Sequence, residues 1–196
     1  MTMPALTVAI LAGGAASRLG GRDKGLEPLA GKPIVEWVLA ACPRSAEIVI
    51  VANRNLDDYA RYGRVVIDTE PGFAGPLAGV ASALDAAASP RVLTLPVDCP
   101  DAPSDLAERL ASALDASDAS AAVAHDGERR QPLFALYRRE LTHAAAAGAK
   151  AGQGVWQWQD SIGAVEVDFA DRRRQFHNLN TSEEFAAFVD VLRTRD

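Results

Sequence analysis

The sequence predicts an α/β fold with three layers, a Rossmann-like arrangement in which helices cover both faces of a mostly parallel central sheet. Short apolar segments alternate along the chain with segments of helical periodicity, which is the order that βαβ units produce. Most of the apolar segments are uninterrupted, as expected for parallel strands that are covered on both faces. The length of 196 residues favours one domain over two.

The first half of the chain supplies four of the expected strands. They are Leu6 to Leu11, Glu47 to Val51, Arg64 to Ile67 and Arg91 to Leu95. A short turn is expected from Pro28 to Pro33, followed by helices at Ile34 to Cys42, at Leu56 to Tyr62 and at the alanine-rich segment Leu77 to Ala88.

The second half continues the alternation. A helix is expected after Ser104, because Leu106, Leu110 and Leu114 recur every four residues. The later elements are strands at Ala119 to Ala124, Pro132 to Leu136 and Ala164 to Val167, and helices at Arg138 to Ala147 and Lys150 to Gln159. The segment Thr181 to Glu184 has the spacing of a capping box and predicts the start of a last helix.

A glycine-rich loop follows the first expected strand. Between Leu11 and Lys24 it holds four glycines and the basic residues Arg18, Arg22 and Lys24. Backbone N–H groups in such a loop can surround an anion, and glycine lets the backbone approach a ligand closely. An ordinary connection with solvated basic residues is the alternative interpretation. The loop matches neither the Walker pattern nor the dinucleotide fingerprint, so a phosphate-binding function would belong to another class of nucleotide loop.

Composition limits the partners and the compartment. The formal net charge of −6 does not favour binding to nucleic acid or to an anionic membrane. Cys42 and Cys99 are the only cysteines, too few for a disulfide framework and without metal-ligand spacing. The chain shows neither a signal-peptide pattern nor an apolar run of membrane-spanning length, so we expect a cytoplasmic protein with no membrane partner.

Two acidic residues stand where neighbouring strands are expected to end, as the glycine-rich loop does. Asp68 follows the third expected strand and Asp98 follows the fourth. Ligands of open parallel sheets bind outside the carboxyl ends of the strands. The sequence therefore predicts a binding site at this edge of the sheet.

Several segments resemble one known family. The glycine-rich loop, written L-A-G-G-x-x-S-R-L-G-x-x-x-K, resembles the signature loop of nucleotidyltransferases that activate small molecules with a nucleoside triphosphate. Four later segments resemble those of the molybdenum cofactor guanylyltransferases: Gly75 to Gly79, Pro96 to Pro100, His125 to Pro132 and Phe176 to Glu184. The resemblance covers nearly the whole chain, in the right order.

The resemblance implies an activity and a set of partners. The activity is transfer of GMP from GTP to the phosphate of molybdopterin, with release of pyrophosphate. It implies Mg²⁺ as cofactor and other proteins of molybdenum cofactor biosynthesis as partners. One domain is implied for residues 1–196, in which about 1–100 bind the nucleotide and about 101–196 bind molybdopterin.

The resemblance also assigns residues to these roles. The implied GTP-binding residues are Leu11, Ala12, Gly13, Gly14, Gly21, Lys24, Asn53, Asp68, Gly75 and Asp98. The implied catalytic residues are Arg18, Lys24 and Asp98, of which Asp98 is the Mg²⁺ ligand, and the implied molybdopterin-binding residues are Arg129, Asn178 and Asn180. Weaker candidates are Arg130 and Lys150 for the molybdopterin phosphate and Trp156 and Trp158 for stacking on the pterin; solvated charge and packing are the alternatives.

One stretch departs from the family pattern. Members often have Asn-Ala-Asn-Arg after the second strand, whereas this chain has Val51-Ala52-Asn53-Arg54. Asn53 or main-chain groups would then contact the guanosine. A cytidylyltransferase acting on molybdopterin, or a sugar-phosphate nucleotidyltransferase, is one alternative. A binding module that delivers molybdopterin or a nucleotide without chemistry is another.

Overall fold

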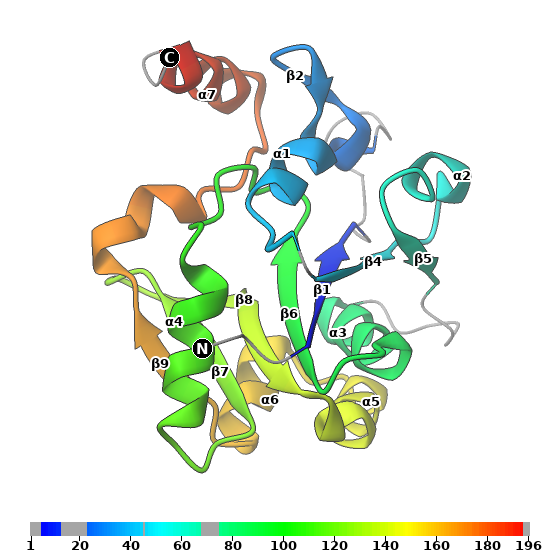
Figure 1. Cartoon of the computed structure of the whole chain (residues 1–196), viewed down its shortest axis with the longest axis vertical. Helices are drawn as coiled ribbons and strands as arrows, with labels where there is room; N and C mark the ends of the chain where they lie inside the picture. Colours follow the sequence, from blue (N-terminus) through cyan, green and yellow to red (C-terminus); the bar gives the residue numbers. More distant parts are fainter. Residues whose placement is uncertain (1–4, 13–22, 45, 68–74, 194–196) are drawn as a thin grey trace.

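A seven-stranded sheet forms the centre of the computed structural model, which describes residues 5–12, 23–44, 46–67 and 75–193 (Figure 1). Its strands are β1 (Leu6–Leu11), β4 (Glu47–Val51), β5 (Arg64–Val66), β6 (Arg91–Pro96), β7 (Ala121–His125), β8 (Arg130–Arg138) and β9 (Val165–Asp168). Their order across the sheet is β5–β4–β1–β6–β8–β7–β9. A small separate hairpin joins β2 (Pro28–Leu29) to β3 (Lys32–Pro33).

The strand directions agree with a mostly parallel sheet. β1 is parallel to β4 and β6, β4 is parallel to β5, and β7 is parallel to β9. β8 alone in this sheet of described strands runs antiparallel to its neighbours β6 and β7. β7 and β8 are joined by a tight turn at 126–129, which only an antiparallel pair permits. The predicted fold class is confirmed.

Helices cover both faces of the sheet. One face carries α1 (Ile34–Ala40), α2 (Leu56–Tyr59), α4 (Leu106–Asp115) and α7 (Ser182–Arg193), and the other carries α3 (Pro76–Ala86), α5 (Thr142–Lys150) and α6 (Val155–Ser161). The described residues also form the 3₁₀ turns η2 (Lys24–Leu26), η3 (Arg139–Leu141) and η4 (Ala170–Phe176). Figure 1 shows α1 and α4 in front of the sheet and α3 and α5 behind it.

Alternate residues of each strand enter different cores. Val8 and Ile10 of β1 pack with α1 and α4, whereas Ala9 and Leu11 pack with α3. Leu110 of α4 is fully buried in the first of these cores. Because both faces of β1 are covered, all of its residues except Thr7 are apolar, and the buried Thr7 hydroxyl donates to Glu47 Oε2 at 2.6 Å.

Several element ends differ from those predicted. β8 is longer than Pro132 to Leu136, because its first two residues also pair with the end of β7, beyond an irregularity in the register. The predicted helix from Lys150 to Gln159 is divided: α5 ends at Lys150, Gly152 has a φ of 73°, and α6 begins only at Val155. A φ in that region favours glycine and ends a helix.

Two further helices also start or end differently. The helix predicted after Ser104 begins at Leu106 and has Asp105 at its N-cap. α2 is shorter than predicted, ending at Tyr59. Within the described part of the chain, no helix is long and apolar enough to span a membrane.

The packing of α4 predicts a large loss of stability for Leu110→Ala. The substitution leaves a cavity at a side chain with no exposed surface, so we expect unfolding to become easier by about 2–5 kcal/mol. Ser112→Ala, at an exposed position of the same helix, should change the free energy of unfolding by less than about 0.5 kcal/mol. Urea unfolding of both variants measures the difference, and equal stabilities would contradict this packing.

Candidate active site

Three neighbouring strands end together at one edge of the sheet. Leu11 at the end of β1 pairs in register with Val51 of β4 and with Pro96 of β6. Asn53 and Asp98 each follow by two residues the end of their strand, so both emerge at this carboxyl edge. Figure 1 shows the β2–β3 hairpin and α7 at the same end of the sheet, toward which β6 points. This is the edge at which the sequence predicted a binding site.

The first two predicted nucleotide-binding residues are still hydrogen-bonded to the sheet, Leu11 at the end of β1 and Ala12 just beyond it. The Ala12 N–H donates to the Val51 C=O at 2.9 Å, and the Leu11 C=O accepts from the Val97 N–H at 3.2 Å. These two groups therefore already have partners. Any contact of Leu11 and Ala12 with a nucleotide would use their other main-chain groups.

Lys24 contacts one residue that was predicted to bind GTP and one that was predicted to bind molybdopterin. It begins η2, and its Nζ lies 3.3 Å from Asp98 Oδ2 and donates to Asn180 Oδ1 at 2.5 Å. The side chains of Lys24 and Asp98 are 25% and 20% exposed. An ammonium, a carboxylate and an amide thus lie together in one partly solvated position. A phosphate group could replace Asp98 as the partner of Lys24, and a metal ion could replace Lys24 as the partner of Asp98.

The loop after β6 holds the C-terminal segment in place. The Asp98 C=O accepts a hydrogen bond from the Leu179 N–H at 2.8 Å, and Cys99 Sγ donates to the Gln175 C=O at 3.2 Å. Burial is the main reason why the pKa of the Cys99 thiol is raised, so the thiol stays protonated and can donate. Both cysteines are free, as predicted for reduced thiols.

A capping box fixes the start of α7 beside Lys24. The Glu184 carboxylate accepts from the N–H groups of Asn180 at 2.6 Å and Thr181 at 2.8 Å, while Thr181 Oγ1 accepts from the Glu184 N–H at 3.2 Å. The hydrogen bond from the Asn180 N–H is the largest cause that lowers the pKa of Glu184, and the charge of Lys24 contributes. The predicted capping box is confirmed, and it orients Asn180. Asn178 lies beside Asn180, and its C=O accepts a hydrogen bond from Asn180 Nδ2 at 3.4 Å.

The turn between β7 and β8 is held by Asp126, a buried carboxylate. It accepts from the N–H groups of Glu128 and Arg129, each at 2.8 Å, and from Gln131 Nε2 at 2.5 Å. Burial acts to raise the pKa of Asp126, but these hydrogen bonds outweigh it and lower the pKa below its ordinary value. The Arg129 side chain is exposed on this turn and, among the described residues, does not contact Lys24, Asp98 or Asn180.

Two of the weaker candidates have structural roles. Arg130 is buried and paired with Asp160 at 2.6 Å and Glu166 at 2.8 Å, so its charge is already neutralised. Trp158 is buried in the core with α3 and α6, whereas Trp156 is exposed and lies near the Arg130 guanidinium. Packing is therefore the function of Trp158.

The other predicted residues fall into two groups. Gly13, Gly14, Arg18, Gly21 and Asp68 lie outside the described residues. Gly75 is the N-cap residue of α3, where it is exposed, and Asn53 is exposed just beyond β4. The structure thus joins Lys24, Asp98 and the 178–180 segment directly and places Asn53 at the same edge.

Three residues beside the site were missed by the sequence analysis: Asp23, Gly25 and Tyr59. Asp23 is buried and accepts hydrogen bonds from the other two, and Gly25 packs directly against Tyr59. The only signal in the sequence is that Asp23 and Gly25 flank the candidate lysine.

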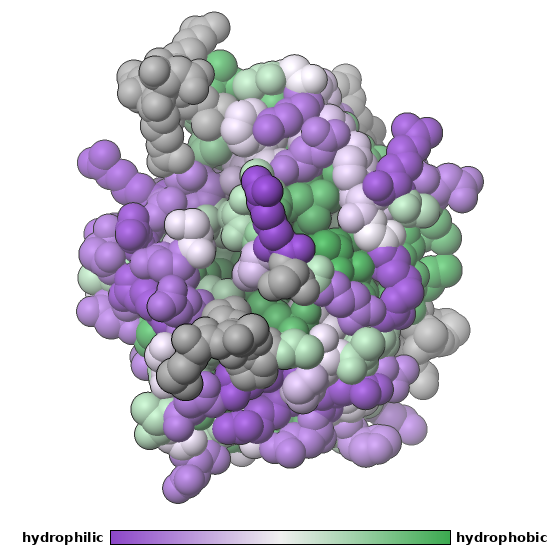
Figure 2. Space-filling model, in the orientation of Figure 1, coloured by the Kyte–Doolittle hydropathy of each residue, from purple (hydrophilic) through white to green (hydrophobic). Residues whose placement is uncertain are grey.

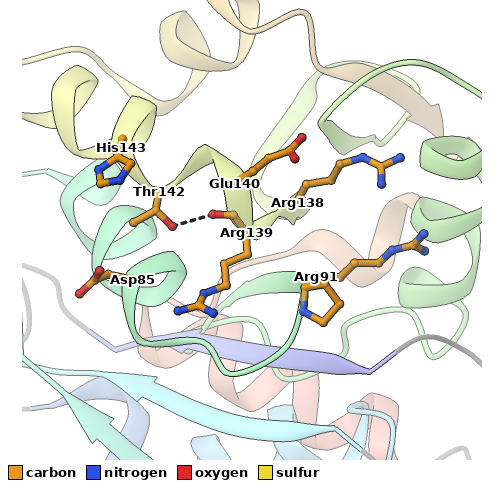
Figure 3. Close-up of a pocket in the computed structure, with 8 residues that line it drawn as sticks. Asp85, Arg91, Arg138, Arg139, Glu140, Thr142 and His143 are labelled. Carbon is orange, nitrogen blue, oxygen red and sulfur yellow. Dashed lines mark hydrogen bonds between the residues drawn. The ribbon is translucent and has the colours of Figure 1, made fainter.

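A concave region lies at the opposite edge of the sheet, away from the site around Lys24. It is a pocket of about 610 Å³ near the start of β6 and the end of β8, lined by Asp85, Pro90, Arg91, Arg138, Arg139, Glu140, Thr142 and His143. Arg91 and Arg138 point the same way and Arg139 points away from them (Figure 3). Arg91 pairs with Asp115, and Asp85 and Glu140 balance much of the remaining charge. β6 runs from Arg91 at this pocket to Pro96, about 17 Å of extended chain, so this pocket is separate from the site around Lys24.

Charged side chains also cover the region around α4 and η4, at the left in Figures 1 and 2. Arg109 of α4 pairs with Asp171 at 3.0 Å and lies over the Phe169 ring at 4.0 Å. Arg172 pairs with Asp105 at 3.5 Å. These contacts attach the segment that leads to Asn178 and Asn180 to the surface of α4.

Comparison with known proteins agrees with this geometry. The model of the MobA-like NTP transferase domain matches residues 8–165. The chain belongs to the MobA-like NTP transferase family. Molybdenum cofactor guanylyltransferases of Mannheimia succiniciproducens and Vibrio vulnificus are 43% and 40% identical to it. The first match covers 89% of this chain and 94% of the relative, and the second covers 96% and 97%. The predicted resemblance and the prediction of a nucleotidyltransferase are confirmed.

Solved structures of other proteins share the fold. Molybdopterin-guanine dinucleotide biosynthesis protein A of Archaeoglobus fulgidus matches with a TM-score of 0.79 and 22% identity, over 96% of this chain and 99% of that one. The 2-C-methyl-D-erythritol 4-phosphate cytidylyltransferase of Thermus thermophilus matches with a TM-score of 0.69 and 21% identity, over 97% and 100%. At these identities the likeness shows the fold alone.

The Asp126 turn predicts a pH-dependent loss of stability. Because the folded-state pKa is lowered, the stabilisation is complete above the unfolded pKa of about 3.9 and is lost as the pH falls through the lower folded value. Asp126→Asn should therefore be less stable at pH 7, by about 1–3 kcal/mol, and should lose less stability on acidification. Denaturant unfolding from pH 7 down to pH 3 measures both effects. Asp118→Asn, at an exposed position, is the control; identical pH profiles for the two variants would contradict this role of Asp126.

Proposed function

We propose that this chain transfers GMP from GTP to the phosphate of molybdopterin and releases pyrophosphate, giving the dinucleotide form of the cofactor. The observation that carries the proposal is the position of Lys24, whose Nζ contacts both Asp98 and Asn180. One contact belongs to the predicted GTP side and the other to the predicted molybdopterin side. The curated relatives carry the name of this activity, at about 40% identity over most of the chain.

The reaction exchanges one phosphoanhydride bond for another. An oxygen of the molybdopterin phosphate forms a bond to the α-phosphorus of GTP, and the bond from that phosphorus to the bridging oxygen of the β-phosphate breaks. Molybdopterin phosphate is already ionised near neutral pH, so no protein base is needed. Catalysis then rests on positioning two polyanions and stabilising the developing charge.

Lys24 and Arg18 are proposed to hold the triphosphate and stabilise the leaving pyrophosphate. The remaining GTP contacts are assigned to Leu11, Ala12, Gly13, Gly14, Gly21, Asn53, Asp68, Gly75 and Asp98, so that residues 1–100 form the nucleotide half of one domain. Residues 101–196 form the molybdopterin half, with Arg129, Asn178 and Asn180 as its proposed contacts. The Lys24–Asn180 hydrogen bond supports a meeting of the two halves at Lys24.

Asp98 is the proposed ligand of Mg²⁺. Family membership supports a divalent ion in general, and a carboxylate is the hard oxygen donor that Mg²⁺ prefers. No group of three or more potential ligand side chains occurs among the described residues, which suits an ion that takes one or two carboxylates and completes its shell with water and phosphate oxygens. Bound there, Mg²⁺ would neutralise phosphate charge. The protein's part is to hold Asp98 at the end of β6 through its contact with Leu179.

The choice of GTP rests on the relatives. Val51 stands where family members often have an asparagine at the guanosine site. A cytidylyltransferase acting on molybdopterin is therefore the alternative. Partner proteins of cofactor biosynthesis, a cytoplasmic location and the absence of nucleic-acid partners stay predictions of the sequence.

A panel of nucleotides tests the reaction. Purified protein, molybdopterin and Mg²⁺ should release pyrophosphate with GTP and at least about 100-fold more slowly with CTP, ATP or UTP, as expected when a site hydrogen-bonds the base edge. The measurement is pyrophosphate release together with detection of the dinucleotide product. Activity with CTP and none with GTP would replace the proposal by its alternative.

Substitutions at the shared position test the site. Lys24→Ala and Asp98→Ala should each lower kcat/KM for GTP by about 10²–10³-fold, because the first removes a positive charge from the phosphates and the second removes the proposed Mg²⁺ ligand. Lys32→Ala and Asp115→Ala remove the same residue types at the β2–β3 hairpin and at the end of α4, and should stay within about twofold of the unmodified protein. Full activity in both site variants would show that the assignment is wrong. No turnover in the unmodified protein would favour a binding module.

A further inference from the structure

A buried carboxylate lies directly before Lys24. Asp23 is 8% exposed, and its Oδ1 accepts from the Tyr59 hydroxyl at 2.5 Å and from the Gly25 N–H at 3.2 Å. Its Oδ2 accepts from Asn55 Nδ2 at 3.0 Å. Both oxygens therefore have donors, as a buried charge requires.

The donors come from two different parts of the chain. Gly25 belongs to η2, while Asn55 and Tyr59 come from the segment that follows β4. Arg54 in that segment adds an opposite charge, with its Nε 3.4 Å from Asp23 Oδ2. Burial and the hydrogen bond to Asp23 raise the pKa of Tyr59, so its hydroxyl remains a donor at any physiological pH.

The turn that carries Lys24 fits tightly against this segment and against β6. A Cβ at Gly25 would lie 2.3 Å from the Tyr59 hydroxyl oxygen and 2.6 Å from Val97 Cγ2. Val97 immediately precedes Asp98. The turn that carries Lys24 is thus packed between Tyr59, which binds Asp23, and Val97, which precedes Asp98.

We propose that Asp23 is a positioning residue that acts through Lys24. Its hydrogen bonds to Tyr59 and Asn55 fix η2, so that Lys24 meets the triphosphate beside Asp98. The same bonds connect the lysine to the segment just after Asn53, on the nucleoside side of the site. This inference rests on the proposed function of Lys24.

A direct catalytic role for Asp23 does not suit its surroundings. Its oxygens are used by protein donors, and a carboxylate repels the phosphates that the site must bind. The effect on the reaction must therefore pass through the position of a neighbour. Two neighbours carry a charge that attracts phosphate. Arg54 is paired with Asp23 itself, whereas Lys24 contacts Asp98, the proposed Mg²⁺ ligand.

Tyr59→Phe tests the proposal, because it removes one donor and keeps the ring. We expect kcat/KM for GTP to fall about tenfold, as for the loss of one hydrogen bond to a charged group. Tyr62→Phe is a matched control three residues away: its hydroxyl donates to Glu36 at 3.1 Å, outside the site, and its loss should leave kcat/KM within about twofold. Both variants are assayed below their melting temperatures, so that any loss of stability is separated from the loss of rate.

The same substitution in a Lys24→Ala background separates positioning from other effects. If Asp23 acts through Lys24, Tyr59→Phe should have almost no further effect on kcat/KM once the lysine is gone, measured at high enzyme concentration. An equal fall in both backgrounds, or no fall in either, would overturn the proposal. Lys24→Ala with unchanged activity would instead contradict the proposed function itself, so the two failures are distinguishable.

Asn55→Gly gives a second test if Tyr59→Phe folds poorly. Asn55 has a φ of 50°, which glycine adopts without strain, and it is exposed, so the variant loses the donor to Asp23 with little change in backbone. A several-fold fall in kcat/KM that disappears in the Lys24→Ala background supports the proposal. An unchanged kcat/KM contradicts it.

Discussion

The register of β4, β1 and β6 is the constraint on which the rest of the site depends. Leu11 pairs with Val51 on one side and with Pro96 on the other, so the three strands deliver their following residues to one place. A slip of one residue would turn every side chain of a strand to the opposite face. Two different helix layers prevent this, because Ile10 belongs to the core with α1 and α4, whereas Leu11 belongs to the core with α3. The packing of the whole sheet therefore fixes the position of Asp98.

The regular part of the fold could be predicted because its signals are local. Apolar strands, the alanine-rich α3 and the capping box at Thr181 each act within a few residues. Contacts made across the chain gave no such signal: Lys24 and Asn180 are 156 positions apart, and nothing in either sequence segment indicates the other. The resemblance to a family assigned both residues to the site, but the segments alone would not have shown that their side chains meet. The two side chains meet because η4 and the residues after it are hydrogen-bonded to the loop that contains Asp98 and Cys99.

Asp23 shows the same limit at shorter range. In a glycine-rich loop an aspartate beside a lysine is expected to be solvated, and the sequence offers no reason to expect burial. Burial follows from Asn55 and Tyr59, which lie 32 and 36 positions further along and reach it only because β4 and β1 are neighbours. The requirement for glycine at position 25 also comes from a distant residue, since any side chain there would meet Tyr59. Residues that position a site are therefore harder to find from sequence than residues that contact a substrate.

Charge explains how an acidic chain can bind two polyanions in the proposed reaction. The net charge is −6, and Lys24 lies among acidic groups, paired with Asp98 and close to Glu184. A partly exposed ion pair contributes little to stability, so separating Lys24 from Asp98 costs little. When phosphates arrive, the lysine can turn to them, while the freed carboxylate is available to a divalent ion that adds further positive charge. Until then the acidic partners hold the lysine in one place. The lysine is thus restrained at the site before the substrate binds, and it loses less conformational entropy in forming the complex than an unrestrained side chain would.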